Sequence, residues 1–146
     1  MTDEKLAERF NEIKGARTIG GILNEKLVEA LIDAQREIGH ATKDSSNPYF
    51  KSSYASLESV IDTAKAALNK HGILFQQVVR ENEDMSSVSV ETILMGHGAE
   101  IKTGILTVPL VKIDPQAFGA ALSYARRYSL SMATGIFQSD DDAESA

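Results

Sequence analysis

Apolar residues recur at helical spacing three times in the first half of the chain. Leu6, Phe10 and Ile13 predict a short amphipathic arm within residues 2–14. A second helix is expected from an N-cap at Asn24 to about residue 40, with an apolar face formed by Leu27, Val28, Leu31, Ile32 and Ile38. A third is expected over residues 57–70, with an apolar face formed by Leu57, Val60, Ile61, Ala64 and Leu68.

The pattern then changes to that of strands. Residues 73–80 are rich in branched and aromatic side chains, and residues 100–110 form a similar run. Between them Val88, Val90, Thr92 and Leu94 alternate with Ser87, Ser89 and Glu91, which is typical of a half-buried strand. Because short turns join the three runs, they predict an antiparallel meander.

A last helix is expected from the cap pair Asp114–Pro115 to about residue 133, with a stop at Gly135. The element order predicts an α+β domain: a three-stranded antiparallel meander followed by a helix, with helices packed on one face of the sheet. We expect an N-terminal arm in residues 1–20, a single domain in residues 21–136 and a flexible acidic tail in residues 137–146.

Composition narrows the class of protein. The chain has 146 residues and no cysteine, which excludes disulfides and thiolate metal sites. No stretch reaches the roughly 20 apolar residues of a membrane span, and the charged start does not resemble a secretion signal. These features predict a cytoplasmic protein without a membrane partner.

The net charge of −6 argues against a nucleic-acid binder until the charges are mapped. Acidic residues dominate residues 81–100 and 137–146, whereas lysine and arginine are in excess over residues 43–80 and 101–136. Phosphate binding depends on the local field, so a basic surface is compatible with an acidic chain.

Catalytic signals are weak. The histidines His40, His71 and His97 lack a second ligand at metal-binding spacing and are interpreted as solvated helix ends or turns. The run Asp140–Asp142 has the ligand type that Mg²⁺ prefers, but no partner motif accompanies it. No phosphate-binding GxxxxGK[ST] motif occurs. The sequence therefore predicts no enzyme activity, no metal and no cofactor, with a metal-dependent nuclease as the alternative.

Two segments carry candidate nucleic-acid chemistry, and the first is the predicted polar loop 43–54. It interleaves lysines with aromatic residues: Lys43, Tyr49, Phe50, Lys51 and Tyr54. Cations along a track and rings on which bases stack are what a single-stranded DNA site needs. The alternative is that Tyr49 or Phe50 packs into the core while the lysines only solubilise the loop.

The second segment is the last helix. Its predicted sheet-facing side consists of Phe118, Leu122, Ala125, Ser129 and Met132. Arg127 is then expected to point away from the sheet with Tyr124 beside it, as an exposed cation–aromatic pair. Tyr128 borders the core, and Arg126 is expected to pair with an acidic residue of this chain or of a neighbouring subunit. The alternative is an ordinary helix surface.

Two segments of the chain resemble the essential recombination function (ERF) family of phage single-strand annealing proteins. They are residues 47–77 (NPYFKSSYASLESVIDTAKAALNKHGILFQQ) and residues 114–136 (DPQAFGAALSYARRYSLSMATGI), the second followed by DDDA. The resemblance spans about 100 residues in the same order and leaves out the first 20. Positions that match the family's motifs are Lys51, Tyr54, Gln116, Gly119, Tyr124, Arg127 and Tyr128.

The resemblance implies ATP-independent annealing of complementary single-stranded DNA during phage-type recombination. It implies homo-oligomers in the form of rings or filaments, loading onto strands exposed by a phage exonuclease, in the cytoplasm of a bacterial host. It also implies kinship with annealing proteins built on a β-β-β-α core. A double-stranded RNA-binding module has a similar element order, but it would have a lysine cluster where Asp114–Gln116 stand. A purely structural phage protein is the third alternative.

Overall fold

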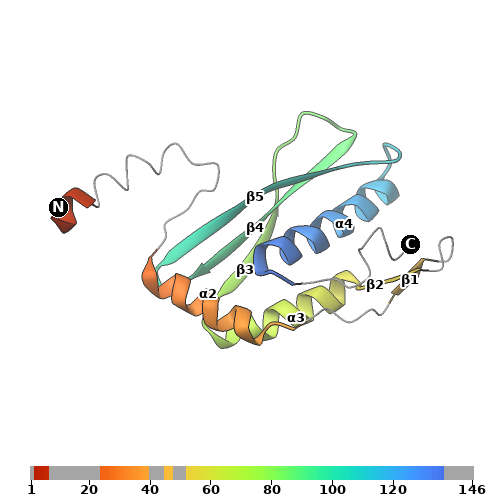
Figure 1. Cartoon of the computed structure of the whole chain (residues 1–146). Helices are drawn as coiled ribbons and strands as arrows, with labels where there is room; N and C mark the ends of the chain where they lie inside the picture. The colour runs from red at the N-terminus through yellow and green to blue at the C-terminus, as the bar shows by residue number, and fades with distance from the viewer. Residues whose placement is uncertain (1, 7–23, 40–44, 48–51, 137–146) are drawn as a thin grey trace.

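The chain folds as an α+β domain in a computed structural model that describes residues 2–6, 24–39, 45–47 and 52–136. Figure 1 shows the elements along the chain: α2 (Glu25–Glu37), β1 (Ser45–Asn47), β2 (Ser52–Tyr54), α3 (Leu57–Lys70), β3 (Leu74–Val79), β4 (Ser87–Gly96), β5 (Ala99–Pro109) and α4 (Pro115–Thr134). The predicted fold class is therefore confirmed.

The three long strands form one antiparallel sheet in the order β3-β4-β5, as the meander predicts. The pairing of β4 with β5 shifts register between Glu91 and Ile93. Gly104 lies opposite this irregularity with φ +107°, a backbone conformation that glycine adopts without the strain of a Cβ. The bulge also turns the Gly104 amide toward the Glu91 carboxylate, 3.2 Å away.

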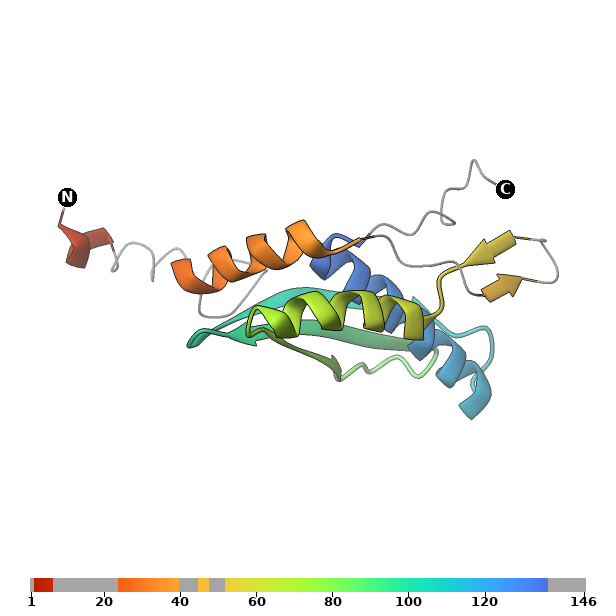
Figure 2. The same cartoon turned by 90° about the horizontal axis from the view of Figure 1, so that it is seen from below.

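Helices α2, α3 and α4 gather on one side of the sheet (Figures 1 and 2). Helix α4 packs on β4 and β5, α3 lies against α4, and α2 packs on α3. The largest fully buried side chains fill the space between these layers: Leu27, Val60, Leu68, Ile73, Val88, Val90, Thr92, Leu94 and Leu130. No helix in the described ranges is long and apolar enough to cross a membrane.

Three predicted features are corrected by the structure. The segment predicted as a loop contains two short strands, and β1 pairs antiparallel with β2. Strand β4 is buried on both faces, because as the central strand it is flanked by the side chains of β3 and β5; Ser89 and Glu91 are 5% and 7% exposed. Val28 and Ile32 of α2 are exposed, because α3 covers the side of α2 that carries Leu27, Ala30 and Ala34.

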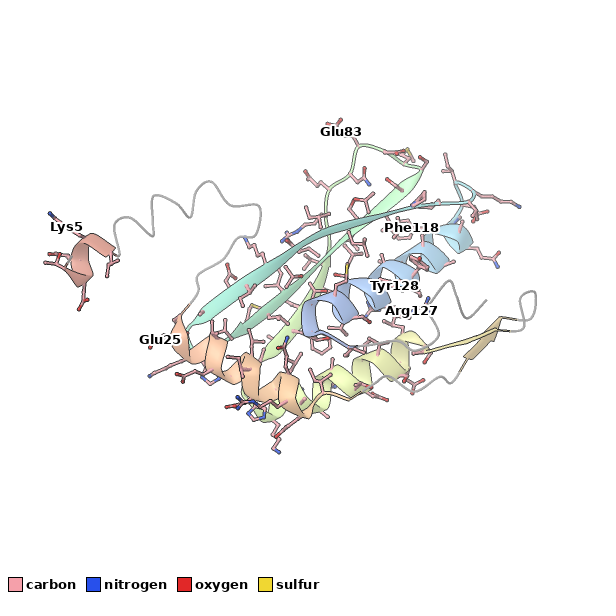
Figure 3. The ribbon with its side chains drawn as sticks, in the orientation of Figure 1. Lys5, Glu25, Glu83, Phe118, Arg127 and Tyr128 are labelled. Atoms are coloured by element: carbon pink, nitrogen blue, oxygen red, sulfur yellow. The ribbon has the colours of Figure 1, made fainter. Side chains whose placement is uncertain are left out.

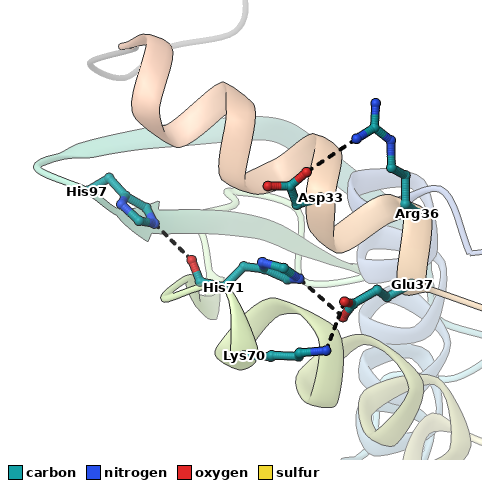
Figure 4. A network of polar contacts seen from close by, with 6 residues as sticks. All are labelled: Asp33, Arg36, Glu37, Lys70, His71 and His97. Carbon is teal, nitrogen blue, oxygen red and sulfur yellow. Dashed lines mark hydrogen bonds and ion pairs between the residues drawn. The ribbon is translucent and has the colours of Figure 1, made fainter.

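A polar network joins the ends of α2, α3 and the β4–β5 turn (Figure 4). Glu37 accepts from Lys70 Nζ at 2.9 Å and lies 3.1 Å from His71 Nε2. His97, in the turn, contacts the His71 carbonyl through Nε2 at 2.8 Å. The hydrogen bond from Lys70, followed by the His71 contact, holds the pKa of Glu37 below its usual value. His71 is half-buried and connects α3 to α2, so it is not the solvated helix end that the sequence predicts, whereas His97 is exposed in its turn as expected.

Candidate nucleic-acid interface

Helix α4 begins and ends as its sequence predicts. The Asp114 carboxylate accepts a hydrogen bond of 2.7 Å from the Ala117 amide, and Pro115 occupies the first turn. Gly135 ends the helix in the left-handed conformation, with φ +79°. These caps fix the helix over Pro115–Thr134 and so fix which way each of its side chains points.

The buried surface of α4 differs from the predicted one. Ala125 and Ser129 are buried as expected, but Phe118 is 40% exposed and Met132 is 66% exposed. The buried positions on the sheet side recur every fourth residue, at Ala117, Ala121, Ala125 and Ser129. Four residues advance about 40° beyond a full turn, so the contact drifts around the helix as α4 crosses the sheet. Phe118 and Met132, which lie near the two ends of the helix, are therefore outside its contact with the sheet.

Arg127 does not point into solvent, which corrects the sequence prediction. It is half-buried, and its Nη1 donates a hydrogen bond of 3.1 Å to the carbonyl oxygen of Ala55. The guanidinium carbon lies 5.7 Å from the Tyr124 ring centroid and 5.1 Å from that of Tyr128. In Figure 3 Arg127 and Tyr128 lie where α4 faces α3. Arg127 is half-buried because the segment before α3 covers this part of α4. If α4 packed on the sheet alone, the same side of the helix would be exposed.

The two tyrosines form a ring pair with unequal exposure. Their centroids are 4.5 Å apart with an interplanar angle of 42°. Tyr124 is 48% exposed, whereas Tyr128 is half-buried, as expected for a residue that borders the core. Because only an exposed ring can stack on a base, Tyr124 is the aromatic side chain of this cluster that a nucleic acid can reach.

Arg126 has a neutral partner in the described part of this chain, and an acidic partner in a neighbouring subunit stays a prediction. Its Nε donates to Gln77 Oε1 at 3.2 Å, and the Gln77 amide donates to the Arg126 carbonyl at 2.8 Å. The same amide donates to Thr92 Oγ1, which is 2.7 Å from Ser129 Oγ. Within the described ranges no carboxylate forms an ion pair with Arg126. Its charge is therefore unmatched there, while Gln77 fixes the orientation of its side chain.

Sequence reasoning missed Gln77 and Ala55, although one signal was present. Gln77 stands between Phe75 and Val79 on the same face of its strand. A polar residue at such a position needs a hydrogen-bond partner on the element that covers it. Ala55 carries no comparable signal, because it acts through its backbone carbonyl.

Most of the remaining predicted site residues belong to the segment before α3. Lys43, Tyr49 and Lys51 lie outside the described residues, as do His40 and the acidic run 140–142. Tyr54 ends β2, where its backbone pairs with Ser45, one residue before the Arg127 contact at Ala55. The described part of the chain contains no group of three side chains that could hold a metal ion.

Comparison with known proteins identifies the family. No curated protein and no solved structure matches the chain. A family model described as the ERF superfamily matches residues 27–146. This range includes nearly all of α2 and every later element of the fold, the Arg127–tyrosine cluster among them. The chain therefore belongs to the ERF superfamily and is a phage-type recombination protein.

Proposed function

We propose that this protein binds single-stranded DNA and anneals complementary strands without ATP. The proposal combines membership of the ERF superfamily with the cation–aromatic surface of α4. The observation that carries the site assignment is the exposed Tyr124 ring, held against Tyr128 at a centroid distance of 4.5 Å. A ring supported from behind offers a base a stacking surface at a low cost in side-chain entropy.

The outer face of α4 gives this site a shape. At about 100° per residue, Tyr124 and Arg126 lie about 160° apart around the helix, and the side between them is exposed in the first half of α4, before Arg127 contacts the segment at Ala55. The exposed positions between them are small or polar: Gln116, Gly119, Ala120 and Ser123. A single strand that crosses this face meets a stacking ring at one edge and the cation of Arg126 at the other.

Further cations stand close to β1 and β2 in the sequence. Lys43 and Lys51 belong to this segment of the sequence, and Tyr49 and Tyr54 add aromatic side chains to it. The β2 strand ends at Tyr54, one residue from the carbonyl that Arg127 contacts. The end of β2 therefore lies beside the tyrosine cluster, and we expect the lysines of this part of the sequence to add to the local field that attracts phosphate.

The annealing step needs no nucleotide cofactor. Phosphate contacts hold a strand extended, and ring stacking separates its bases from one another, so a second bound strand samples them for complementarity. Base pairing then supplies the free energy. A ring or filament of protomers would place several such sites in a row on strands that a phage exonuclease exposes.

The first experiment measures the annealing rate of two complementary fluorescent oligonucleotides without ATP, together with single-strand affinity. Tyr124→Ala is expected to weaken binding by roughly 5- to 150-fold, since one stacked base contributes about 1–3 kcal/mol. Tyr124→Phe retains the ring and is expected to remain close to the wild-type protein. Met132→Ala is the matched control, because it truncates another exposed side chain of the same helix.

Three outcomes would contradict the proposal. Equal affinities for Tyr124→Ala and Met132→Ala would remove Tyr124 from the site. Preferential binding of duplex RNA would favour a double-stranded RNA-binding module. Strand cleavage that requires Mg²⁺ would favour a nuclease that uses the acidic run Asp140–Asp142.

A further inference from the structure

Arg127 connects the two parts of the proposed DNA site. We propose that it is a positioning residue, which fixes the β1–β2 hairpin relative to Tyr124, and that it is not a phosphate ligand. This inference rests on the proposed function, because it assigns Arg127 a role within that site.

The contacts of Arg127 link three parts of the chain. The guanidinium lies 5.7 Å from the Tyr124 ring centroid and 5.1 Å from the Tyr128 centroid, both on α4. Its Nη1 donates to the carbonyl of Ala55 at 3.1 Å, across 72 residues of sequence. Ala55 itself is fully buried in the core formed with α2 and α3. One side chain thus holds the ring cluster and the start of the α3 segment together.

The contact at Ala55 falls where the chain changes direction. Strand β2 ends at Tyr54, and Ser56 is the N-cap of α3, where its hydroxyl accepts from the Ser59 amide at 3.1 Å. Only Ala55 lies between the last residue of β2 and this cap. The carbonyl belongs to the planar peptide unit between Ala55 and the Ser56 cap, so the Arg127 hydrogen bond holds the chain at the point from which the hairpin extends.

The geometry requires arginine in particular. A guanidinium is planar, so it can pack against tyrosine rings while its N–H groups donate in the plane to a carbonyl. An ammonium keeps the charge but not the planar stacking geometry. A phosphate ligand would tolerate lysine, because a single phosphate contact depends mainly on charge. The Arg127→Lys variant therefore separates the two roles.

The test compares Arg127→Lys and Arg127→Ala with the wild-type protein by single-strand affinity at several salt concentrations and by annealing rate. If Arg127 is a positioning residue, both variants are expected to lose single-strand affinity by about tenfold or more. The reason is that lost pre-organisation weakens binding without removing a phosphate contact. The slope of log K against log salt should stay at the wild-type value. A phosphate ligand would instead lower that slope by about 0.7 in Arg127→Ala, while Arg127→Lys stayed close to wild type.

A distance measurement tests the positioning directly. The natural sequence has no cysteine, so spin labels can be attached at Ser46→Cys in β1 and Ser123→Cys on the exposed side of α4. The distribution of distances between the labels is expected to be narrow with Arg127 and broader with either substitution. An unchanged distribution in folded variants would overturn the proposal.

Controls distinguish the possible failures. Arg36→Ala removes a charge from an exposed pair on α2 and should change neither the distribution nor the annealing rate. Circular dichroism below the unfolding transition shows that each variant is folded. Normal annealing in folded Arg127→Ala would contradict the positioning role alone. A wild-type protein that fails to anneal would contradict the proposed function, and the distance measurement would still decide whether Arg127 orders the hairpin.

Discussion

The ion pair between Arg80 and Glu91 provides the sharpest test of the packing of the sheet. Glu91 is 7% exposed although it points away from the helices, and Arg80 contacts its Oε1 through Nε at 2.9 Å and through Nη2 at 2.6 Å. Its other oxygen accepts from the Gly104 amide at the β-bulge. Removing Arg80 would leave a buried carboxylate with one backbone donor and no counter-charge.

The expected magnitude follows from that imbalance. Breaking a buried ion pair from one side costs about 3–5 kcal/mol. The Arg80 side chain is 35% exposed, so water can reach the site, and a loss of about 2–3 kcal/mol is the better expectation for Arg80→Met. For a domain of this size, the unfolding midpoint should fall by about 5–10 °C.

A double-mutant cycle isolates the electrostatic interaction between Arg80 and Glu91 from the other effects of each substitution. Glu91→Gln alone should cost about 1 kcal/mol, because the amide oxygen still accepts from Gly104 and the exposed end of Arg80 can be hydrated. The double variant should be only about 1 kcal/mol less stable than the wild-type protein, since no buried charge remains, which gives a coupling of about 2–3 kcal/mol. Urea unfolding of the four proteins measures these differences.

The comparison has a matched control. Arg36→Met breaks an ion pair between side chains that are 75% and 53% exposed, and should cost no more than about 0.5 kcal/mol. A loss in Arg80→Met as small as in this control would refute the reasoning. Additive losses in the cycle would do the same, because they would show that the two charges do not depend on each other.

Three further predictions concern the glycines and the pH dependence of stability. Gly119→Ala should raise the free energy of unfolding by about 0.5–1 kcal/mol, since no described atom lies within 4 Å of the added Cβ; a loss in chemical denaturation would contradict this. Gly96→Ala should lower it by about 1–3 kcal/mol, because the added Cβ would collide with the carbonyl oxygen of Gly72; an unchanged thermal midpoint would show that the turn moves without cost. Because the pKa of Glu37 is lowered in the folded state by Lys70, its contribution to stability is full above the unfolded value near 4.5 and is lost as the pH falls through the folded value. In Glu37→Gln the free energy of unfolding should therefore fall less steeply with decreasing pH in acid than in the wild-type protein. Equal slopes for the two proteins would exclude this contribution.

The sequence predicts those parts of the fold whose neighbours are close in the chain. Helix α3 has a strict apolar repeat and a serine cap, and Val60, Ala64 and Leu68 are buried as expected. The meander follows from short turns that allow only antiparallel neighbours. In these elements the local pattern and the tertiary contacts agree, so the pattern alone is sufficient to predict the element and its buried side chains.

The prediction fails where burial depends on distant neighbours. Glu91 has the sequence context of an exposed position on an alternating strand, but β3 and β5 enclose β4 and supply Arg80 as its partner. Phe118 and Met132 fit an apolar stripe of fixed direction, whereas a helix that crosses a sheet changes its buried side along its length. Crossing angles and strand order are not encoded in any local window of the sequence.

The adjacent arginines of α4 show why a motif does not by itself assign roles to its residues. The sequence YARRY presents Arg126 and Arg127 as equivalent cations, and the spacing along the helix favours Arg127 as the exposed one. In the structure Arg127 bonds a backbone carbonyl beside a buried joint, while Arg126 lies against a neutral glutamine with no described carboxylate paired to it. Because Ala55 contributes only its carbonyl, which every residue has, no pattern of side chains could have predicted this difference. If the charge of α4 contributes to phosphate binding, its salt dependence should therefore respond to Arg126→Ala, and the order of the hairpin should respond to Arg127→Ala.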